Sequence, residues 1–381
     1  MAPENKIILE PNIGGEEIHR QDQNMTHYPV VMHLSQLWHQ SFGPAATLLD
    51  FNNPPSPTAH WEWLPEGPGL LPWLATPFTE SRAKKLGLQH LGPQAAHVAI
   101  VHDKGFACET AKKIQHQEGW EFSHVLGPIQ EPTEAEETLK GIVANWPSWA
   151  QDNFTIKPRM GSSGRGRIAG KRGIIGTQHI QGLTKMSSRA GAIVEPWYST
   201  ISNMSTQLLI SPTGDHRIIG HTSQVLTDSG TYLGNHGTLS QGIPGSNTSF
   251  DTTLTSIAQA IAPLIALKGF TGPCGFDAFS FHCSVSNEIR LRAPLEINAR
   301  FTSAMVGLGH MHAFATTQKI EDGSWLFLLD AQDSWCRDAQ TNSLWKSKTL
   351  ESSNTGKRAL IVLSTEKNAI RRWLEAIGLK P

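Results

Sequence analysis

A glycine-rich, cationic run directly after a strand-like segment places the strongest constraint on what this chain can fold into. Residues 155–170, TIKPRMGSSGRGRIAG, contain one lysine, three arginines and four glycines. Glycine reaches backbone angles that other residues avoid, so such a run can turn several N–H groups toward one anion, and Arg165 and Arg167 add positive charge. The next segment, RIAGKRGII, predicts a returning strand. We therefore expect the glycines to lie at the tip of a β-hairpin.

Two interpretations of this hairpin tip stay open. It is either a flexible, solvated turn or a loop that folds over the phosphates of a nucleotide. The run lacks the Gly-Lys-Ser/Thr ending of a Walker A loop, and the spacing of Gly164, Gly166 and Gly170 differs from that of the dinucleotide fingerprint. Lys157, on the incoming strand, favours the phosphate loop because its ammonium group can reach the same phosphates.

Length and composition place the chain among soluble globular proteins. Its 381 residues suggest two or three packed units, and 39% of them are hydrophobic while 17% are charged. A net charge of −1 argues against a surface built wholly for nucleic acid. The N-terminus lacks a secretory leader pattern and no run approaches ~18 apolar residues, so we expect a cytoplasmic protein with no membrane span. Four cysteines without CxxC spacing are expected to be free thiols.

The pattern of elements changes along the chain. Residues 1–95 are rich in proline and aromatic residues, which predicts ordered loops around short strands, and their tryptophans either pack in a core or line an acceptor pocket. The segment TEAEETLKGIVANW predicts a helix with Thr133 as N-cap and Glu136 completing a capping box. From Phe154 strands dominate, with a hairpin turn at residues 212–215, followed by an apolar helix that ends near Gly269.

The segment RLRAPLEINARF carries the second set of candidate side chains. Read as one strand, it places Glu296, Asn298 and Arg300 on one face, with Arg290 and Arg292 on the same side. Carboxylate and amide oxygens suit Mg²⁺, and a guanidinium suits a phosphoryl group. Asp277, on the preceding strand, can complete the metal set. The alternative is the solvated face of an antiparallel sheet. Arg292 in particular either binds a substrate carboxylate or pairs with an acidic neighbour.

With these motifs in order, residues 75–310 resemble the ATP-grasp superfamily. The segments VHDKGF, IKPRMGSSGRGR, AIVEPWY, GFDAFSF and LEINARF follow one another as the family's nucleotide and metal segments do. The resemblance implies an α/β (α+β) fold in which two α+β subdomains clamp a nucleotide, after an N-terminal α/β domain. We accordingly expect an N-terminal domain over 1–95, an ATP-grasp domain over 96–330 with a lid at about 115–195, and an α/β appendage over 331–381.

The resemblance also implies roles for individual residues. Arg300 and Lys157 would be catalytic, and the metal ligands would be Asp277, Glu296 and Asn298. The segment AIVEPWY resembles the hinge that reads adenine in the family. Where many members carry an acidic residue for the ribose, this chain has Asn203. The stretch 222–242 lies where related enzymes place acceptor-facing loops, so Gln224, His236 and Arg292 are the substrate candidates. The residues implied for ATP are Lys104, Lys157, Gly161, Ser162, Ser163, Gly164, Gly166, Glu195, Pro196, Trp197, Tyr198 and Asn203. Taken singly, three of these residues also have an ordinary structural interpretation. Lys104 fits a turn lysine, Trp197 a core residue and Asp277 a capped acid in a loop.

The function implied is that of an ATP-dependent carboxylate–amine ligase. In such enzymes a carboxylate attacks the γ-phosphoryl of ATP bound with Mg²⁺ or Mn²⁺, and an amine captures the acylphosphate. The expected substrates are a small carboxylic acid and an amine, and an amino acid or small peptide is the candidate substrate class. A homodimer is also expected, because family members are often dimers. No nucleic acid or membrane partner is expected. Two alternatives are a phosphotransferase on the same fold and a non-catalytic nucleotide-binding regulatory protein.

Overall fold

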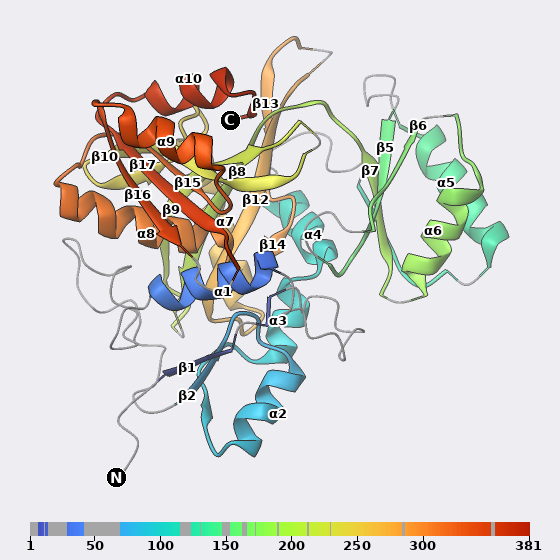
Figure 1. The fold of residues 1–381 in the computed structure, drawn as a ribbon. Helices are drawn as coiled ribbons and strands as arrows, with labels where there is room; N and C mark the ends of the chain where they lie inside the picture. The colour runs from blue at the N-terminus through green and yellow to red at the C-terminus, as the bar shows by residue number, and fades with distance from the viewer. Residues whose placement is uncertain are drawn as a thin grey trace.

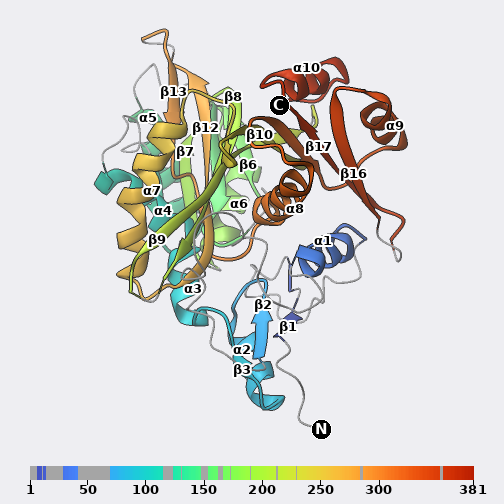
Figure 2. The ribbon, with the colours of Figure 1, turned by 90° about the vertical axis from the view of Figure 1, so that its left-hand side faces the viewer.

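The described residues form three sheets with flanking helices (Figures 1 and 2). The computed structural model describes residues 7–10, 12–13, 29–41, 69–114, 123–129, 131–146, 153–161, 166–171, 173–188, 190–211, 213–228, 230–283, 286–351 and 355–381. Across these ranges no helix has the length and apolar character needed to cross a membrane. Cys108, Cys274, Cys283 and Cys336 are all free and buried, which confirms the prediction of free thiols.

The first sheet is parallel and short. Its order is β1-β2-β3, and α1, α2 and α3 lie around it (Figure 1). Trp38 of α1 and Trp73, just after β2, are buried and pack edge to face at 5.4 Å, and both contact Phe301. Both tryptophans therefore pack in a core, and Trp38 also borders a cavity beside α1. The bounds are β1 (Ile7–Glu10), α1 (Pro29–Ser41), β2 (Gly69–Pro72), α2 (Pro77–Lys85), β3 (Gln89–His90) and α3 (Ala95–Val101).

A four-stranded antiparallel sheet forms a separate unit, with order β4-β7-β5-β6. Helices α5 and α6 cover one face of it (Figure 1), and Leu139, Phe154 and Leu183 lie in the core between them. The hairpin of β5 and β6 brackets the glycine-rich run, so its predicted place at a hairpin tip is confirmed. We call this the four-stranded unit. Its elements are β4 (His124–Leu126), α5 (Pro132–Ala144), β5 (Asn153–Pro158), β6 (Ile168–Lys171), α6 (Thr177–Ser187) and β7 (Ala192–Pro196).

The start of α5 corrects the predicted capping box. The helix begins at Pro132 and its N-cap is Glu131, with no side-chain cap hydrogen bond. Thr133 therefore lies inside the first turn. Proline is well suited to this first position because its ring presets φ and its missing N–H has no partner there in any helix.

The largest sheet has ten strands, in the order β13-β12-β8-β9-β10-β15-β17-β16, with β11 beside β10 and β14 beside β12. Helix α7 packs on β8 and β9 and α8 packs on the opposite face, as Figure 2 shows. The last strands, from the region expected as an appendage, extend this same sheet. The strands are β8 (Thr200–Ile210), β9 (His216–Leu226), β10 (Tyr232–Ser240), β11 (Ile243–Gly245), β12 (Gly272–His282), β13 (Ile289–Arg292), β14 (Ile297–Asn298), β15 (Gly323–Leu328), β16 (Trp345–Glu351) and β17 (Arg358–Ser364).

Five further helices complete the described part of the chain. Helix α4 lies between the four-stranded unit and the ten-stranded sheet in Figure 1. Helix α10 packs through Ile370 and Leu374 against Leu326 and Leu328 of β15. The bounds are α4 (Lys104–Ile114), α7 (Asp251–Ala266), α8 (Ser303–Gln318), α9 (Asp333–Thr341) and α10 (Ala369–Ala376).

The segment predicted as one strand from 290 to 301 is interrupted. Strand β13 ends at Arg292 and β14 covers only Ile297–Asn298, with residues 293–296 between them. Pro294 offers no N–H to a strand ladder, which explains the break. Backbone bonds still hold the gap against β12, because Leu295 N donates to Asp277 O at 2.8 Å and Asp277 N donates to Glu296 O at 3.1 Å. Glu296 is thereby fixed beside Asp277.

Candidate nucleotide and metal site

The residues predicted as metal ligands lie together. Asp277 is on β12, Glu296 precedes β14 and Asn298 is on β14, whose pairing with β12 sets Asn298 opposite Gly275. Asn298 Nδ2 donates to Asp277 Oδ2 at 3.3 Å. Arg300 completes the row, since its Nη2 donates to Asn298 Oδ1 at 3.0 Å. We call these four residues the acidic cluster.

The two carboxyl groups of the acidic cluster have pKa values shifted in opposite directions. Burial, and then the neighbouring Glu296 carboxylate, hold the pKa of Asp277 well above its usual range. Burial also pushes the pKa of Glu296 upward, but Lys104 and the hydrogen bond from Asp277 outweigh it and lower that pKa to about 2. A proton shared by the pair is therefore held more tightly by Asp277 than by Glu296.

This donor set fits a divalent cation. Two carboxylates and one amide oxygen are hard oxygen ligands, and a bound Mg²⁺ or Mn²⁺ would take the place of the shared proton and relieve the repulsion between the acids. Among the residues that the structure describes, no group of three or more His, Cys, Asp and Glu side chains is arranged to hold a metal. The ion would therefore depend on Asn298, on water or on a phosphate for its further ligands.

Lys104 connects the acidic cluster to the glycine-rich hairpin. Its Nζ lies 3.1 Å from Glu296 Oε2 and also donates to the carbonyl oxygen of Gly161. The side chain is 9% exposed, so this contact is shielded from bulk water. Lys104 is the first residue of α4, and its position is fixed by a 3.1 Å bond from its own N–H to Arg159 O. Two segments far apart in the sequence thus meet at one ammonium group.

Lys157, the second predicted phosphate lysine, lies at the end of β5 and forms an ion pair with Glu195 on the adjacent strand β7. Its charge also lowers the pKa of Glu296, together with that of Lys104. Both predicted lysines therefore act on the same carboxylate. The 17% exposed Lys157 side chain keeps access to solvent on one side.

Glu195 is held by two cations. Burial raises its pKa, but Lys157 and Arg292 more than offset this and lower it. Arg292 Nη2 lies 3.5 Å from Glu195 Oε2 and donates to Ser123 Oγ at 2.6 Å. With only 2% of its side chain exposed, Arg292 pairs with an acidic neighbour, which was one of its two predicted roles. Sequence reasoning missed Ser123, since nothing in its local segment indicates this contact.

Two glycines in the described part of the glycine-rich loop adopt left-handed backbone angles. Gly161 has φ +141° and Gly166 has φ +76°, values that favour glycine. Ser162, Ser163 and Gly164 lie outside the described residues. The guanidinium of Arg167, on the returning side of the hairpin, lies 4.1 Å from the centre of the Trp197 ring. This cation–π contact brings the loop to the segment predicted to read adenine.

In that predicted hinge, the backbone and side chains have different partners. Pro196 is the last residue of β7, and Trp197 N donates to Asn153 O at 2.9 Å. Tyr198 is buried, with its ring 4.5 Å from that of Phe281 and 5.3 Å from the Arg292 guanidinium. The Tyr198 ring therefore belongs to a small aromatic core. A base in this position would contact the Trp197 side chain and the hinge backbone.

Asn203 and Gln224 lie on the same face of the ten-stranded sheet as Asp277. Asn203 is two residues from Ser205, which pairs with Asp277, and Gln224 is two residues from Thr222, which pairs with Ser205. A buried polar chain continues along this face, because Tyr232 donates to Asn235 Oδ1 and Asn235 Nδ2 donates to Thr222 Oγ1 at 3.0 Å.

His236 does not share that face. It pairs with Leu326 of β15, whose side chain packs under α10, and it is 3% exposed. Burial lowers the pKa of His236 to about 3. His236 therefore lies on the far face of the sheet from the acidic cluster, and the structure does not bring it together with the other predicted site residues.

No protein-family model matches the sequence, and no curated protein matches it. Solved structures do match. The N5-carboxyaminoimidazole synthetase of Staphylococcus aureus shares 9% identity with a TM-score of 0.52, covering 98% of this chain and 96% of its own. The biotin carboxylase domain dimer of 2-oxoglutarate carboxylase from Hydrogenobacter thermophilus, in complex with MgADP, ADP and bicarbonate, shares 13%, covering 81% and 73%, with a TM-score of 0.52. The chain has the ATP-grasp fold.

A third ATP-grasp structure extends the comparison. The carboxyaminoimidazole ribonucleotide synthase of Aspergillus clavatus, complexed with ATP, shares 12% identity over 81% of this chain and 80% of its own, with a TM-score of 0.52. The fold class implied by the order of the sequence motifs is thus confirmed. At these identities the likeness concerns the fold, and the roles of individual residues rest on the geometry described above.

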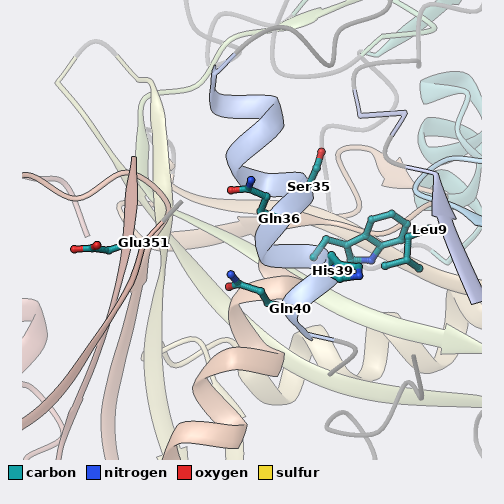
Figure 3. A pocket seen from close by; sticks show the side chains of 7 residues that line it. Leu9, Ser35, Gln36, His39, Gln40 and Glu351 are labelled. Carbon is teal, nitrogen blue, oxygen red and sulfur yellow. The ribbon is translucent and has the colours of Figure 1, made fainter. Parts of the chain in front are cut away.

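A cavity of about 360 Å³ lies elsewhere in the fold, between α1 and β16 (Figure 3). Figure 3 shows Gln36 and Gln40 of α1 on the side of Glu351, with Leu9 on the opposite side. None of the residues predicted for nucleotide or metal binding lines it. The acidic cluster is therefore a separate place in the fold.

Proposed function

We propose that this chain is an ATP-dependent, ADP-forming carboxylate–amine ligase that makes an amide or peptide bond through an acylphosphate. The observation that carries the proposal is the position of Lys104, which contacts both Gly161 of the hairpin and Glu296 of the acidic cluster. A triphosphate with its metal needs cations and oxygen ligands within a few ångströms of each other, and this junction supplies both.

The residues divide into two sets around the nucleotide. Lys104, Lys157 and the glycine-rich loop would hold the phosphates, and Trp197 with the hinge backbone would hold the base. Asp277, Glu296 and Asn298 would hold Mg²⁺ or Mn²⁺, which when bound neutralises phosphate charge. Without nucleotide, both lysines are paired with carboxylates, so binding would exchange one anionic partner for another. The site is then preorganised with little buried charge left unpaired.

Arg300 is placed to act on the reacting group. It is tied to Asn298 Oδ1 and to Phe301 O, which orients the guanidinium beside the acidic cluster. In the proposed reaction an oxygen of the acid displaces ADP from the γ-phosphorus, and the amine nitrogen then displaces phosphate from the acyl carbon. Arg300 would stabilise the charge on the transferred phosphoryl group and on the departing phosphate.

The acid and the amine are the open part of the proposal. One ATP-grasp neighbour was solved with bicarbonate, and the Aspergillus clavatus synthase was also solved with ADP and 5-aminoimidazole ribonucleotide. These set two starting points for substrates, alongside the amino acids and small peptides implied by the resemblance. A homodimer is part of the proposal, and one neighbour is itself a dimer.

A phosphate-release screen tests this function. The full-length protein is incubated with Mg-ATP and a matrix of acids, bicarbonate included, crossed with amines. A ligase gives ADP and phosphate only when both partners are present, together with a condensed product. A phosphorylated acid that accumulates without the amine identifies a phosphotransferase instead. Glu296→Gln is the control, because it removes a metal ligand, and turnover by that variant at the wild-type rate would overturn the assignment.

A further inference from the structure

Asp103 and Arg159 form a two-pronged ion pair beside the proposed nucleotide site. Arg159 Nε donates to Asp103 Oδ1 at 3.0 Å, and Nη2 donates to Oδ2. The Arg159 side chain is 28% exposed and that of Asp103 is 18% exposed, so the pair is largely shielded from solvent. Only arginine matches both carboxylate oxygens in this planar geometry. Neither residue belongs to the sets assigned above to phosphate, metal or base.

Each partner adjoins one of the two lysines. Asp103 immediately precedes Lys104, and it also orients the start of α4 because its Oδ1 accepts from Gly105 N at 2.7 Å. Arg159 lies two residues after Lys157 and two before Gly161. Its carbonyl accepts the N–H of Lys104 at 3.1 Å. The ion pair therefore connects the first turn of α4, which carries Lys104, to the end of β5, which carries Lys157.

The surrounding backbone leaves room for this arrangement. Arg159 N donates to Gly191 O at 3.2 Å. Gly191 has φ +100°, and a Cβ there would lie 2.3 Å from Leu126 O and 2.8 Å from Arg159 Cδ. A Cβ on Gly105 would approach Arg159 Nε to 3.2 Å. The guanidinium thus passes between two glycines, and any side chain at position 191 would push it out of place.

We propose that Asp103 and Arg159 act as a clamp that fixes the spacing of Lys104 and Lys157, which makes Arg159 a positioning residue for the nucleotide. This inference rests on the proposed function, because it assumes that the two lysines hold phosphates. Arg159 itself does not touch the phosphates in this account. It acts by preorganising the lysines, so its loss weakens nucleotide binding without removing a ligand.

The test is a binding titration of the full-length protein with Mg²⁺ and a non-hydrolysable ATP analogue, alongside urea unfolding. Arg159→Gln is expected to raise the Kd by roughly tenfold or more through lost preorganisation. Arg159→Lys keeps the charge and one hydrogen bond and should fall between that variant and the wild type. Asp103→Asn retains the acceptor for Gly105 N. If the two residues act as one unit, the double variant should bind the nucleotide no more weakly than the weaker-binding of the two single variants.

A matched control separates positioning from general stability. Arg358→Gln removes another arginine–aspartate contact, the 2.8 Å pair with Asp333, which joins β17 to α9 and involves neither lysine. It should leave the Kd unchanged. A purely structural role for the clamp would lower the unfolding free energy while the folded molecules bind as the wild type does, and that result overturns the inference. Fully additive effects of Asp103→Asn and Arg159→Gln overturn it as well.

Two further outcomes are informative. If Arg159→Gln fails to fold, Asp103→Asn carries the test, and unchanged binding by that variant counts against the clamp. If the wild-type protein itself does not bind the Mg-nucleotide, the proposed function fails and the clamp fails with it. Binding by the wild type together with unaltered binding by both variants removes the clamp alone.

Discussion

Lys104 Nζ lies 3.1 Å from Glu296 Oε2, although the two residues belong to segments far apart in the chain. The same nitrogen reaches Gly161 O in the glycine-rich hairpin. One ammonium group thus joins a helix start, a hairpin and an interrupted strand. A buried cation without a partner is costly, and Glu296 supplies the negative charge that compensates Lys104.

Lys157→Ala should weaken Mg-ATP binding strongly and leave the protein folded. A hydrogen bond to a charged group is worth about 1.5–3 kcal/mol, which corresponds to a rise in Kd of roughly 10-fold to 150-fold. Glu195 keeps Arg292 as a partner in the variant, so the protein should lose some stability but stay folded. Titration calorimetry checks the affinity, with Lys348→Ala on the exposed edge of β16 as control. Equal Kd values for the two variants would refute the role of Lys157.

Arg292→Ala should destabilise the fold sharply. The residue is 2% exposed, and its removal leaves Glu195 with one cation and Ser123 without its donor. Removing one partner from a buried ion pair costs about 3–5 kcal/mol. Arg290→Ala, two residues earlier on the same strand and 34% exposed, should change the unfolding free energy by less than about 0.5 kcal/mol. Urea unfolding of both variants provides the comparison, and similar losses would contradict the buried-pair account.

Asp277→Asn should stabilise the protein without metal while abolishing turnover. Burial and Glu296 raise the pKa of Asp277, so the folded state binds a proton that the unfolded state releases above its ordinary pKa of 3.8. Stability is therefore lost as the pH rises, and the amide removes this cost. We expect a gain of about 1 kcal/mol in unfolding free energy near neutral pH, the usual size for relieving a functional site. A variant less stable than the wild type at pH 8 would contradict this.

Stability should also fall in acid because of His236. Its pKa is lowered to about 3 by burial, against 6.5 ordinarily, so between these values the unfolded state binds a proton that the folded state does not. The unfolding free energy from this group then decreases by about 1.4 kcal/mol per pH unit as the pH drops through that window. His236→Gln should flatten the profile measured by urea unfolding. His39→Gln, at an exposed position, should not, and parallel curves for both would exclude the effect.

Features that depend on a local sequence pattern could be predicted from the sequence. The hairpin of β5 and β6 followed from glycines between two strand-like runs, and the neighbouring positions of Glu296 and Asn298 followed from their spacing near β12. Pro294 was the visible signal for the break that the single-strand reading overlooked. At that point a local rule about proline outweighed the alternation of polar and apolar residues.

Other features depend on contacts that no local pattern contains. Arg292 meets Ser123, 169 residues away, and Glu195, 97 residues away, so its role as a buried ion-pair partner could be raised only as an alternative. The face of His236 depends on register. Strand β10 has an irregularity between Tyr232 and Gly234, and a shift of one residue turns every later side chain to the other face. The sequence alone therefore does not reveal that His236 and Gln224, both substrate candidates, lie on opposite faces of the sheet.

The most direct test of the account is a crystal structure of the full-length protein with Mg²⁺ and a non-hydrolysable ATP analogue. The account predicts phosphate oxygens in contact with Lys104 and Lys157, and the metal between those oxygens and the carboxylates of Asp277 and Glu296. A nucleotide bound in the cavity between α1 and β16, or a metal away from both carboxylates, would contradict it.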